Sequence, residues 1–214
     1  MDLNNTSEKH IAIARHCRYA IAGNTKDPKS ILIVLHGYGQ LARFFIRKFS
    51  PLYKEHLIIA PEGPHRFYLE GSSGRVGASW MTKEDRLSDI CDNHIMLDAI
   101  YDELRSDYPT AKAFHIVGFS QGGATAARWT TIGQERFDSL TLWACVYPPD
   151  LNIPNETYNG KRIFVIGSND EYYNDEAQEN LKRSYSEKGF EIITYDGNHT
   201  IDQDTLVGLQ KDFG

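Results

Sequence analysis

Residues 114–123 read Phe-His-Ile-Val-Gly-Phe-Ser-Gln-Gly-Gly, an apolar β-type run that leads through a glycine-flanked serine into a helical pattern. A sharp strand-to-helix turn forces its serine into a sparsely populated backbone conformation and exposes the hydroxyl above the sheet. Side chains two residues to either side would collide in such a turn, which explains Gly118 and Gly122. The helix that follows points its free N–H groups at Ser120. The stretch therefore predicts a serine nucleophile at the end of a strand.

Short apolar runs alternate with helical patterns along the rest of the chain. Strands are predicted at 31–35, 57–60, 114–117, 140–146, 163–166 and 191–195, with an antiparallel leading strand within 11–20. Helices are predicted at 41–49, 86–105, 121–131, 175–187 and 202–213. Most of the strands are continuously apolar, which is typical of parallel strands covered on both faces. The pattern predicts one α/β domain over residues 1–214, a mostly parallel central sheet with helices on both faces.

Two further features are predicted, an apolar face on the helix at 86–105 and an irregular segment before it. An apolar stripe is predicted along the helix by Leu87, Ile90, Ile95, Leu97, Ile100 and Leu104. The preceding segment, 61–83, is rich in glycine and aromatic residues and follows neither the strand nor the helix period. It is interpreted either as a lid-like excursion that forms part of a substrate wall or as a surface loop with a short hairpin.

The amino-acid composition and net charge exclude several classes of function. The 214 residues are 41% hydrophobic and 24% charged, the balance of a globular protein, and the net charge of −6 disfavours binding to nucleic-acid backbones. No run of about 18 apolar residues exists, and the polar first ten residues do not resemble a secretory signal, so neither a membrane span nor secretion is expected. Cys17, Cys91 and Cys145 lack the pairing of a zinc or redox motif, which favours reduced thiols in the cytoplasm.

A second glycine turn, at residues 35–39, is predicted to supply a backbone N–H group that binds an oxyanion. Acyl transfer needs two backbone N–H groups that stabilise the negative oxygen of the tetrahedral intermediate. The N–H of Gln121 follows the nucleophile directly, and the loop Leu35-His-Gly-Tyr-Gly39 can direct the N–H of Tyr38 to the same point. His36 precedes the glycine turn and is interpreted as a brace of the loop rather than as a base.

A serine hydroxyl needs an imidazole to accept its proton, and a carboxylate to hold that imidazole. Of eight histidines, only His199 follows the last predicted strand and precedes a terminal helix. Asp170 follows the strand at 163–166, which gives the order Ser120, Asp170, His199 that α/β hydrolases use. Other candidate acids are kept as alternatives, namely Asp150 after the preceding strand and, less favoured, Glu171 and Asp175.

With these residues placed, the chain resembles the phospholipase/carboxylesterase family of small α/β hydrolases, which includes acyl-protein thioesterases. The matching pieces are Leu35-His-Gly-Tyr-Gly39, Ala60-Pro-Glu-Gly-Pro64, Gly118-Phe-Ser-Gln-Gly-Gly123, Gly167 with Asp170, and Gly197-Asn-His199. The resemblance implies an α/β-hydrolase fold that cleaves carboxylic esters, thioesters or lysophospholipids without a cofactor or metal. Two departures concern the pocket. Tyr38 stands where the family usually has a smaller aliphatic residue, and Glu171-Tyr172-Tyr173 replaces a Val-Pro pair.

The sequence thus predicts a serine hydrolase that acts on a small-molecule ester or thioester through an acyl-enzyme. Trp80, Tyr172 and Tyr173 are candidate walls of the substrate pocket. Two alternatives use the same residues. One is a non-catalytic hydrolase-like protein that binds a small ligand, which a complete triad disfavours; the other is an acyltransferase or perhydrolase in which an alcohol or peroxide replaces water. The sequence does not specify an oligomeric state.

Overall fold

The computed structural model describes residues 7–132, 137–151 and 160–214. Its main sheet has seven strands in the order β1-β3-β2-β6-β7-β8-β9. These are β1 (Tyr19–Gly23), β2 (Ile31–Leu35), β3 (Leu57–Pro61), β6 (Phe114–Phe119), β7 (Ser139–Trp143), β8 (Lys161–Gly167) and β9 (Glu191–Tyr195). Only the pairing of β1 with β3 is antiparallel among these described strands. The predicted mostly parallel sheet is confirmed.

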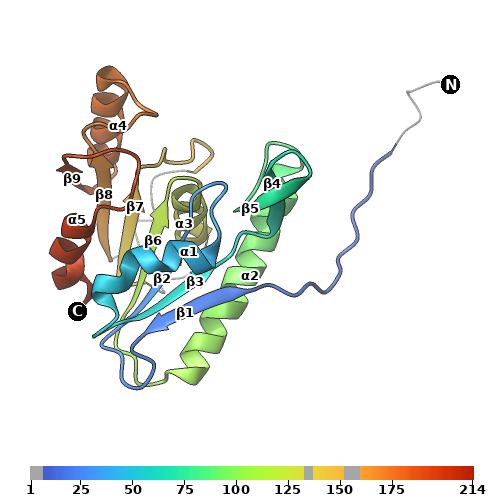
Figure 1. Cartoon of the computed structure of the whole chain (residues 1–214), viewed down its shortest axis with the longest axis horizontal. Helices are drawn as coiled ribbons and strands as arrows, with labels where there is room; N and C mark the ends of the chain where they lie inside the picture. The colour runs from blue at the N-terminus through green and yellow to red at the C-terminus, as the bar shows by residue number, and fades with distance from the viewer. Residues whose placement is uncertain (1–6, 133–136, 152–159) are drawn as a thin grey trace.

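Helices cover both faces of this sheet (Figure 1). One face carries α2 (Arg86–Asp107), α3 (Gln121–Ile132) and α4 (Asp175–Glu187). The other carries α1 (Ala42–Phe45), the 3₁₀ helix η2 (Ile46–Leu52), α5 (Gln203–Gly208) and the 3₁₀ helix η3 (Leu209–Phe213). Among the described helices, none combines the length and apolar character that crossing a lipid bilayer requires.

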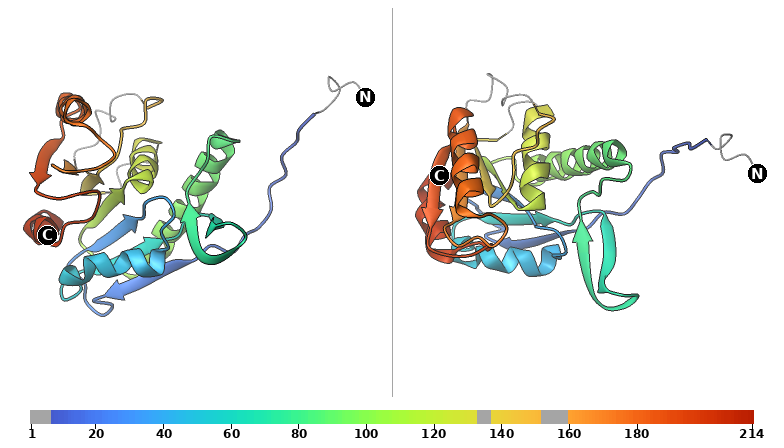
Figure 2. Two further views of the ribbon diagram at one scale, coloured as in Figure 1. Left: turned by 45° about the horizontal axis from the view of Figure 1, so that its top comes forward. Right: turned by 90° about the horizontal axis from the view of Figure 1, so that it is seen from above.

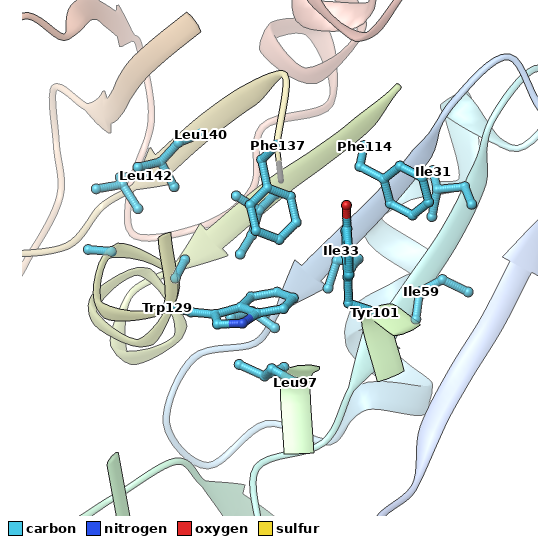
Figure 3. Packing of buried hydrophobic residues seen from close by; sticks show 14 of the residues in the cluster. Ile31, Ile33, Ile59, Leu97, Tyr101, Phe114, Trp129, Phe137, Leu140 and Leu142 are labelled. Atoms are coloured by element: carbon cyan, nitrogen blue, oxygen red, sulfur yellow. The ribbon is translucent and has the colours of Figure 1, made fainter. Parts of the chain in front are cut away.

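The strands are apolar throughout because each face buries its own core. Along β2, Ile31 and Ile33 point toward α2 and α3, whereas Leu32 and Val34 belong to the cluster under α1, η2 and α5. Four aromatic residues of the first cluster gather near β2 and β6, namely Tyr101, Phe114, Trp129 and Phe137 (Figure 3). In that cluster the ring centroid of Trp129 lies 4.8 Å from that of Phe137. Alternate residues of one strand therefore serve two separate apolar layers.

Three local expectations differ from the structure. The leading strand lies at β1, not over most of 11–20, and Ile11 and Ile13 are 86% and 79% exposed, so their alternation has no sheet partner. The helix expected at 41–49 is a short α1 that continues as η2, which contains Pro51. The terminal helix likewise divides into α5 and η3.

The apolar stripe expected along α2 is also partly wrong. Leu97, Ile100 and Leu104 are buried as expected, but Leu87 and Ile95 are exposed. Met96 and Tyr101 are buried instead, so the buried face is rotated from the predicted one. Packing against α3 and the sheet, rather than the hydrophobicity of each residue, decides which face of this helix is covered.

Residues 61–83 contain a hairpin, as the second of the two interpretations expected. Strands β4 (His65–Glu70) and β5 (Ser73–Ser79) pair antiparallel as a separate sheet that projects from the body (Figure 2). The base of the hairpin is joined to the loop after β2. The Gly39 N–H donates to the Ala78 carbonyl (2.9 Å), and the Ala78 N–H donates to the Gln40 carbonyl (3.1 Å). The hairpin therefore begins beside the predicted oxyanion loop.

Acid should destabilise this fold through a buried imidazole. His115, at the start of β6, has Nδ1 2.8 Å from the Ser139 hydroxyl, and burial lowers the pKa of His115 to about 4. An unfolded histidine titrates near pH 6.5, so between about pH 6.5 and pH 4 the unfolded chain binds more protons than the folded one. The free energy of unfolding should fall by up to about 3 kcal/mol as the pH drops through this window. Urea unfolding at pH 7 and pH 4.5 measures it. The difference should be smaller in His115→Gln, and an undiminished difference in that variant would contradict the assignment.

Candidate active site

The predicted nucleophile lies where the sequence placed it. Ser120 stands between β6 and α3 with φ of +53°, a left-handed conformation that side-chain-bearing residues rarely adopt. Its N–H donates to the Trp143 carbonyl at the end of β7 (2.9 Å), and its side chain is only partly covered. The backbone strain, combined with an accessible hydroxyl, is what a nucleophile turn requires.

The two glycines beside the serine are required by backbone contacts. A Cβ added to Gly118 would lie 2.5 Å from the Gly123 Cα atom. One added to Gly122 would lie 2.3 Å from the Leu35 carbonyl oxygen. Helix α3 therefore approaches β2 and β6 more closely than any side chain at these positions permits.

Substitution of Gly122 should be costly for this reason. Gly122→Ala is expected to lower the free energy of unfolding by about 3 kcal/mol, because the methyl group meets backbone that cannot rotate away. Gly208→Ala is the matched control, since no atom lies within 4 Å of the added methyl group in α5. Its stability should remain within about 1 kcal/mol of the wild-type value. Denaturant titration of the three proteins measures both, and equal stabilities would show that α3 has room to shift.

His199 and Asp170 meet at the carboxyl end of the sheet. His199 Nδ1 lies 2.7 Å from Asp170 Oδ2, and the Asp170 side chain is completely buried while that of His199 is 10% exposed. The imidazole lies 4.9 Å, centroid to centroid, from the ring of Phe119, the residue before Ser120. When Nδ1–H donates to the carboxylate, Nε2 remains free to accept a proton. The ring therefore lies beside the serine turn, and a proton on Nδ1 leaves Nε2 as the acceptor that a base requires.

Backbone hydrogen bonds connect the loops that carry this pair. The Ser168 N–H donates to the Tyr195 carbonyl (2.8 Å), and the Asn169 N–H donates to the Gly197 carbonyl (2.9 Å). A Cβ added to Gly167 would lie 2.3 Å from the Gly197 carbonyl oxygen, so the loops after β8 and β9 are in direct contact. Contact between the loops after β8 and β9 keeps the Asp170 carboxylate next to the His199 imidazole.

Two further residues position His199, and sequence reasoning missed both roles. The Tyr195 hydroxyl lies 2.7 Å from each of the carbonyl oxygens of Asn198 and Thr200, on either side of the histidine. The Glu171 carboxylate accepts the His199 N–H (3.0 Å). Tyr195 carried no signal in the sequence, because a tyrosine in an edge strand is ordinary. Glu171 was considered only as an alternative acid.

The competing acid, Asp150, is engaged elsewhere. Arg128 Nη2 lies 2.8 Å from Asp150 Oδ1, and Arg86 Nη1 lies 3.7 Å from the same oxygen. The hydrogen bond from Arg128 lowers the pKa of the Asp150 carboxyl. The structure therefore brings Asp170, and not Asp150, to His199.

The loop after β2 lies beside the nucleophile. A Cβ added to Gly37 would lie 3.3 Å from the Ser120 Cβ atom, and Gly39 has φ of +74°. His36 is buried, and its Nε2 accepts the Gly63 N–H (2.9 Å) while Nδ1 lies 2.8 Å from the Gly37 carbonyl. Burial lowers the pKa of His36. His36 thus braces the loop, as the sequence indicated.

The two N–H groups predicted to hold an oxyanion are free to donate. No acceptor for the N–H of Tyr38 or Gln121 occurs among the described residues. Gln121 begins α3, and the first N–H groups of a helix have no acceptor within the helix. Both groups belong to backbone fixed by the turns described above. They can therefore stabilise negative charge without reorganisation.

The Gln121 side chain has a separate structural role, which the sequence did not indicate. Its Oε1 accepts the Trp80 N–H (3.0 Å) and the Ser79 hydroxyl (3.1 Å), and its Nε2 donates to the Met81 carbonyl (2.8 Å). One amide group thus fastens the end of β5 to the first turn of α3. Three hydrogen bonds on one side chain make the hairpin base part of the site's scaffold.

The predicted pocket aromatics lie at different depths. Trp80 is fully buried and its indole N–H donates to the His36 carbonyl (2.8 Å), so it lies behind the oxyanion loop and offers no surface. Tyr173 is half-buried and packs against the core. Tyr172 is 71% exposed, with its ring 4.5 Å from the His199 ring. Of the three, only Tyr172 stands at the surface next to the imidazole.

Cys145 has no part in this arrangement. It is buried, and burial raises the pKa of its thiol to about 12. The thiol therefore stays protonated at neutral pH. In the described ranges, no group of three or more histidine, cysteine, aspartate or glutamate side chains is positioned to hold a metal ion.

The fold and the surroundings of Ser120 define the α/β class of serine hydrolases. A protein-family model described as "Serine hydrolase (FSH1)" matches residues 25–206, and the chain belongs to this serine hydrolase family. The resemblance to small α/β hydrolases drawn from the motifs is thereby confirmed. A comparison with curated protein sequences finds no match.

Solved structures share the fold, among them two that are described as esterases. Esterase PE8 superposes with a TM-score of 0.71 at 21% identity, covering 92% of this chain and 99% of that one. The Bacillus cereus carboxylesterase gives 0.67 at 16% identity, with 92% and 95% coverage. SOBER1 of Arabidopsis thaliana gives 0.61 at 18% identity, with 86% and 97% coverage. At these identities the likeness establishes the α/β-hydrolase fold.

Proposed function

We propose that the protein hydrolyses carboxylic esters through an acyl-enzyme on Ser120, with His199 as the base and Asp170 as its partner. The observation that carries the proposal is the 2.7 Å contact between Asp170 and His199, beside the strained turn of Ser120. Membership in a serine hydrolase family supports it. A non-catalytic binding protein would not require Asp170, His199 and Ser120 to lie next to one another.

The proposed reaction consists of two acyl transfers. His199 Nε2 accepts the Ser120 proton as Oγ attacks the carbonyl carbon, and the N–H groups of Tyr38 and Gln121 hold the oxyanion. The imidazolium gives that proton to the leaving alcohol or thiol as its bond to the carbonyl breaks. Water then loses a proton to the imidazole and attacks the acyl-enzyme. Collapse of the second intermediate returns the proton to Ser120 and releases the acid.

The finer assignments extend this proposal. Carboxylic esters are the first choice of substrate, with thioesters and lysophospholipids as alternatives, and Tyr172 forms part of the pocket wall. The exposed free thiols of Cys17 and Cys91 favour a reducing compartment such as the cytoplasm. The residues proposed for catalysis follow β2, β6, β8 and β9 of a single sheet, which supports one domain.

A fluorophosphonate probe tests the nucleophile directly, because it reacts with activated serines. The wild-type protein should be labelled once and Ser120→Ala not at all, whereas Ser186→Ala, at an exposed position in α4, should label normally. Rates on nitrophenyl esters, acyl thioesters and lysophospholipids then rank the substrates. Product analysis with added alcohols separates hydrolysis from acyl transfer. Labelling of Ser120→Ala at the wild-type rate would refute the proposal.

A further inference from the structure

A groove of about 550 Å³ lies between α1 and the β4–β5 hairpin. Phe44 and Phe45 of α1 line one side, and Leu69 and Val76 of the hairpin line the other. Phe44 is 51% exposed, and the guanidinium groups of Arg43 and Arg47 lie 4.6 Å and 5.2 Å from the centroid of its ring. Both elements are labelled in Figure 1. Apolar and polar side chains line the groove together, as is typical of a binding site for a small molecule.

The groove is connected to the candidate active site on two sides. Gly39 and Gln40 line its edge and directly follow Tyr38, whose N–H is proposed to hold the oxyanion. Lys48 also lines the groove, and its ammonium donates to the Thr200 hydroxyl (3.0 Å), next to His199. Residues of the groove lining are therefore chain neighbours of Tyr38 and hydrogen-bond partners of the residue after His199.

Positive charge gathers around this groove without compensation. Arg43, Lys48 and Arg75 line it, and its lining includes no carboxylate. Arg43 and Arg75 stand on opposite walls, and none of the three cations forms an ion pair with a described residue. Elsewhere in this chain of net charge −6, some cations, such as Arg18 and Arg128, have carboxylate partners, and others, such as Lys54, have none among the described residues. The groove differs in that three cations and no carboxylate share one lining. A basic groove on an acidic protein attracts an anion.

We propose that this groove binds an anionic group of the substrate, a carboxylate or a phosphate attached to an apolar segment. The apolar segment packs on Phe44 and Leu69, and the anion lies between Arg43 and Arg75. This inference rests on the proposed function and narrows it, because the protein then prefers negatively charged esters to neutral esters of the same length. Guanidinium groups on both walls can each donate two parallel hydrogen bonds to carboxylate or phosphate oxygens.

Matched substrates test the preference. We would compare the mono-4-nitrophenyl ester of an eight-carbon dicarboxylic acid with its neutral terminal amide, and with an analogue that ends in phosphate. A fourth ester carries the carboxylate on the nitrophenyl ring, to distinguish an anion in the acyl part from one in the leaving group. The wild-type kcat/KM should favour at least one anionic ester over its neutral counterpart by about tenfold at low salt. The anionic ester that is preferred identifies the anion as carboxylate or phosphate, and places it in the acyl part or in the leaving group.

Variants then locate the preference in the groove. The double variant Arg43→Gln/Arg75→Gln should lose about fivefold or more of it, mainly through a higher KM, while the neutral ester stays within about twofold of wild type. Lys54→Gln/Lys211→Gln removes the same charge from exposed positions outside the groove lining and should leave the preference intact.

Three results would overturn the inference: equal rates on anionic and neutral esters in the wild type, an unchanged preference in the groove variant, or an equal loss in the control. Each of these leaves hydrolysis of the neutral ester in place. Absence of hydrolysis of every ester, together with absence of fluorophosphonate labelling, would instead reject the proposed function itself.

Discussion

His199→Ala is expected to lower kcat for ester hydrolysis by about 10⁶-fold, because the Ser120 hydroxyl then has no base to accept its proton. His199 lies in a loop, so the variant should still fold, with some loss of stability because the buried Asp170 carboxylate loses its partner. Initial rates on a nitrophenyl ester measure the loss, and thermal unfolding verifies that the variant is folded.

His16→Ala provides the control, since His16 is exposed and lies outside every strand and helix. Its rate should equal that of the wild type. If a folded His199→Ala protein kept even about one per cent of the wild-type kcat, another group would have to be the base.

Asp170→Asn is expected to reduce kcat by about 10⁴-fold. An asparagine amide can donate to Nδ1 of the imidazole, which moves the ring proton to Nε2 and removes the acceptor that Ser120 needs. The two side chains are nearly identical in shape, so the buried site should keep its packing. Fluorophosphonate labelling should slow in parallel with ester hydrolysis.

Asp150→Asn separates the two candidate acids. Its rate should stay near the wild-type value, but the protein should lose stability because Arg128, 5% exposed, loses its nearest anionic partner. Reversed effects, with Asp150→Asn inactive and Asp170→Asn active, would assign the acid to Asp150.

The central strands could be predicted because burial on both faces leaves a continuous apolar run. Strand β2 matches the predicted range, and β3, β6 and β8 differ by one to three residues. The edge strand β9 also matches its predicted range, although it is only partly buried. The turn at Ser120 was predictable for a different reason, since the glycines at 118 and 122 admit few other backbone paths. The contact between Asp170 and His199 followed from topology alone, because β8 and β9 are adjacent and parallel.

Other features depend on distant partners, and no local pattern reveals them. Ile11 and Ile13 alternate with small and polar residues as in a strand, but no neighbouring strand pairs with them. Trp80 is typical of a pocket aromatic in sequence, yet its indole bonds a carbonyl 44 residues away and it is buried. The glycine-rich hairpin follows no clean alternation, so its strands could be expected only as one of two interpretations.

The Gln121 amide that fastens the hairpin has a consequence for how such an enzyme can diversify. The outer part of β4 and β5 can change in length and chemistry, because its stem is anchored on Gln121, the residue whose N–H is proposed to hold the oxyanion. New substrate preferences can thus arise at the tip of the hairpin while the reaction centre keeps its alignment. Without the hydrogen bonds of the Gln121 side chain, a change at the tip of the hairpin would also shift the residues around Ser120.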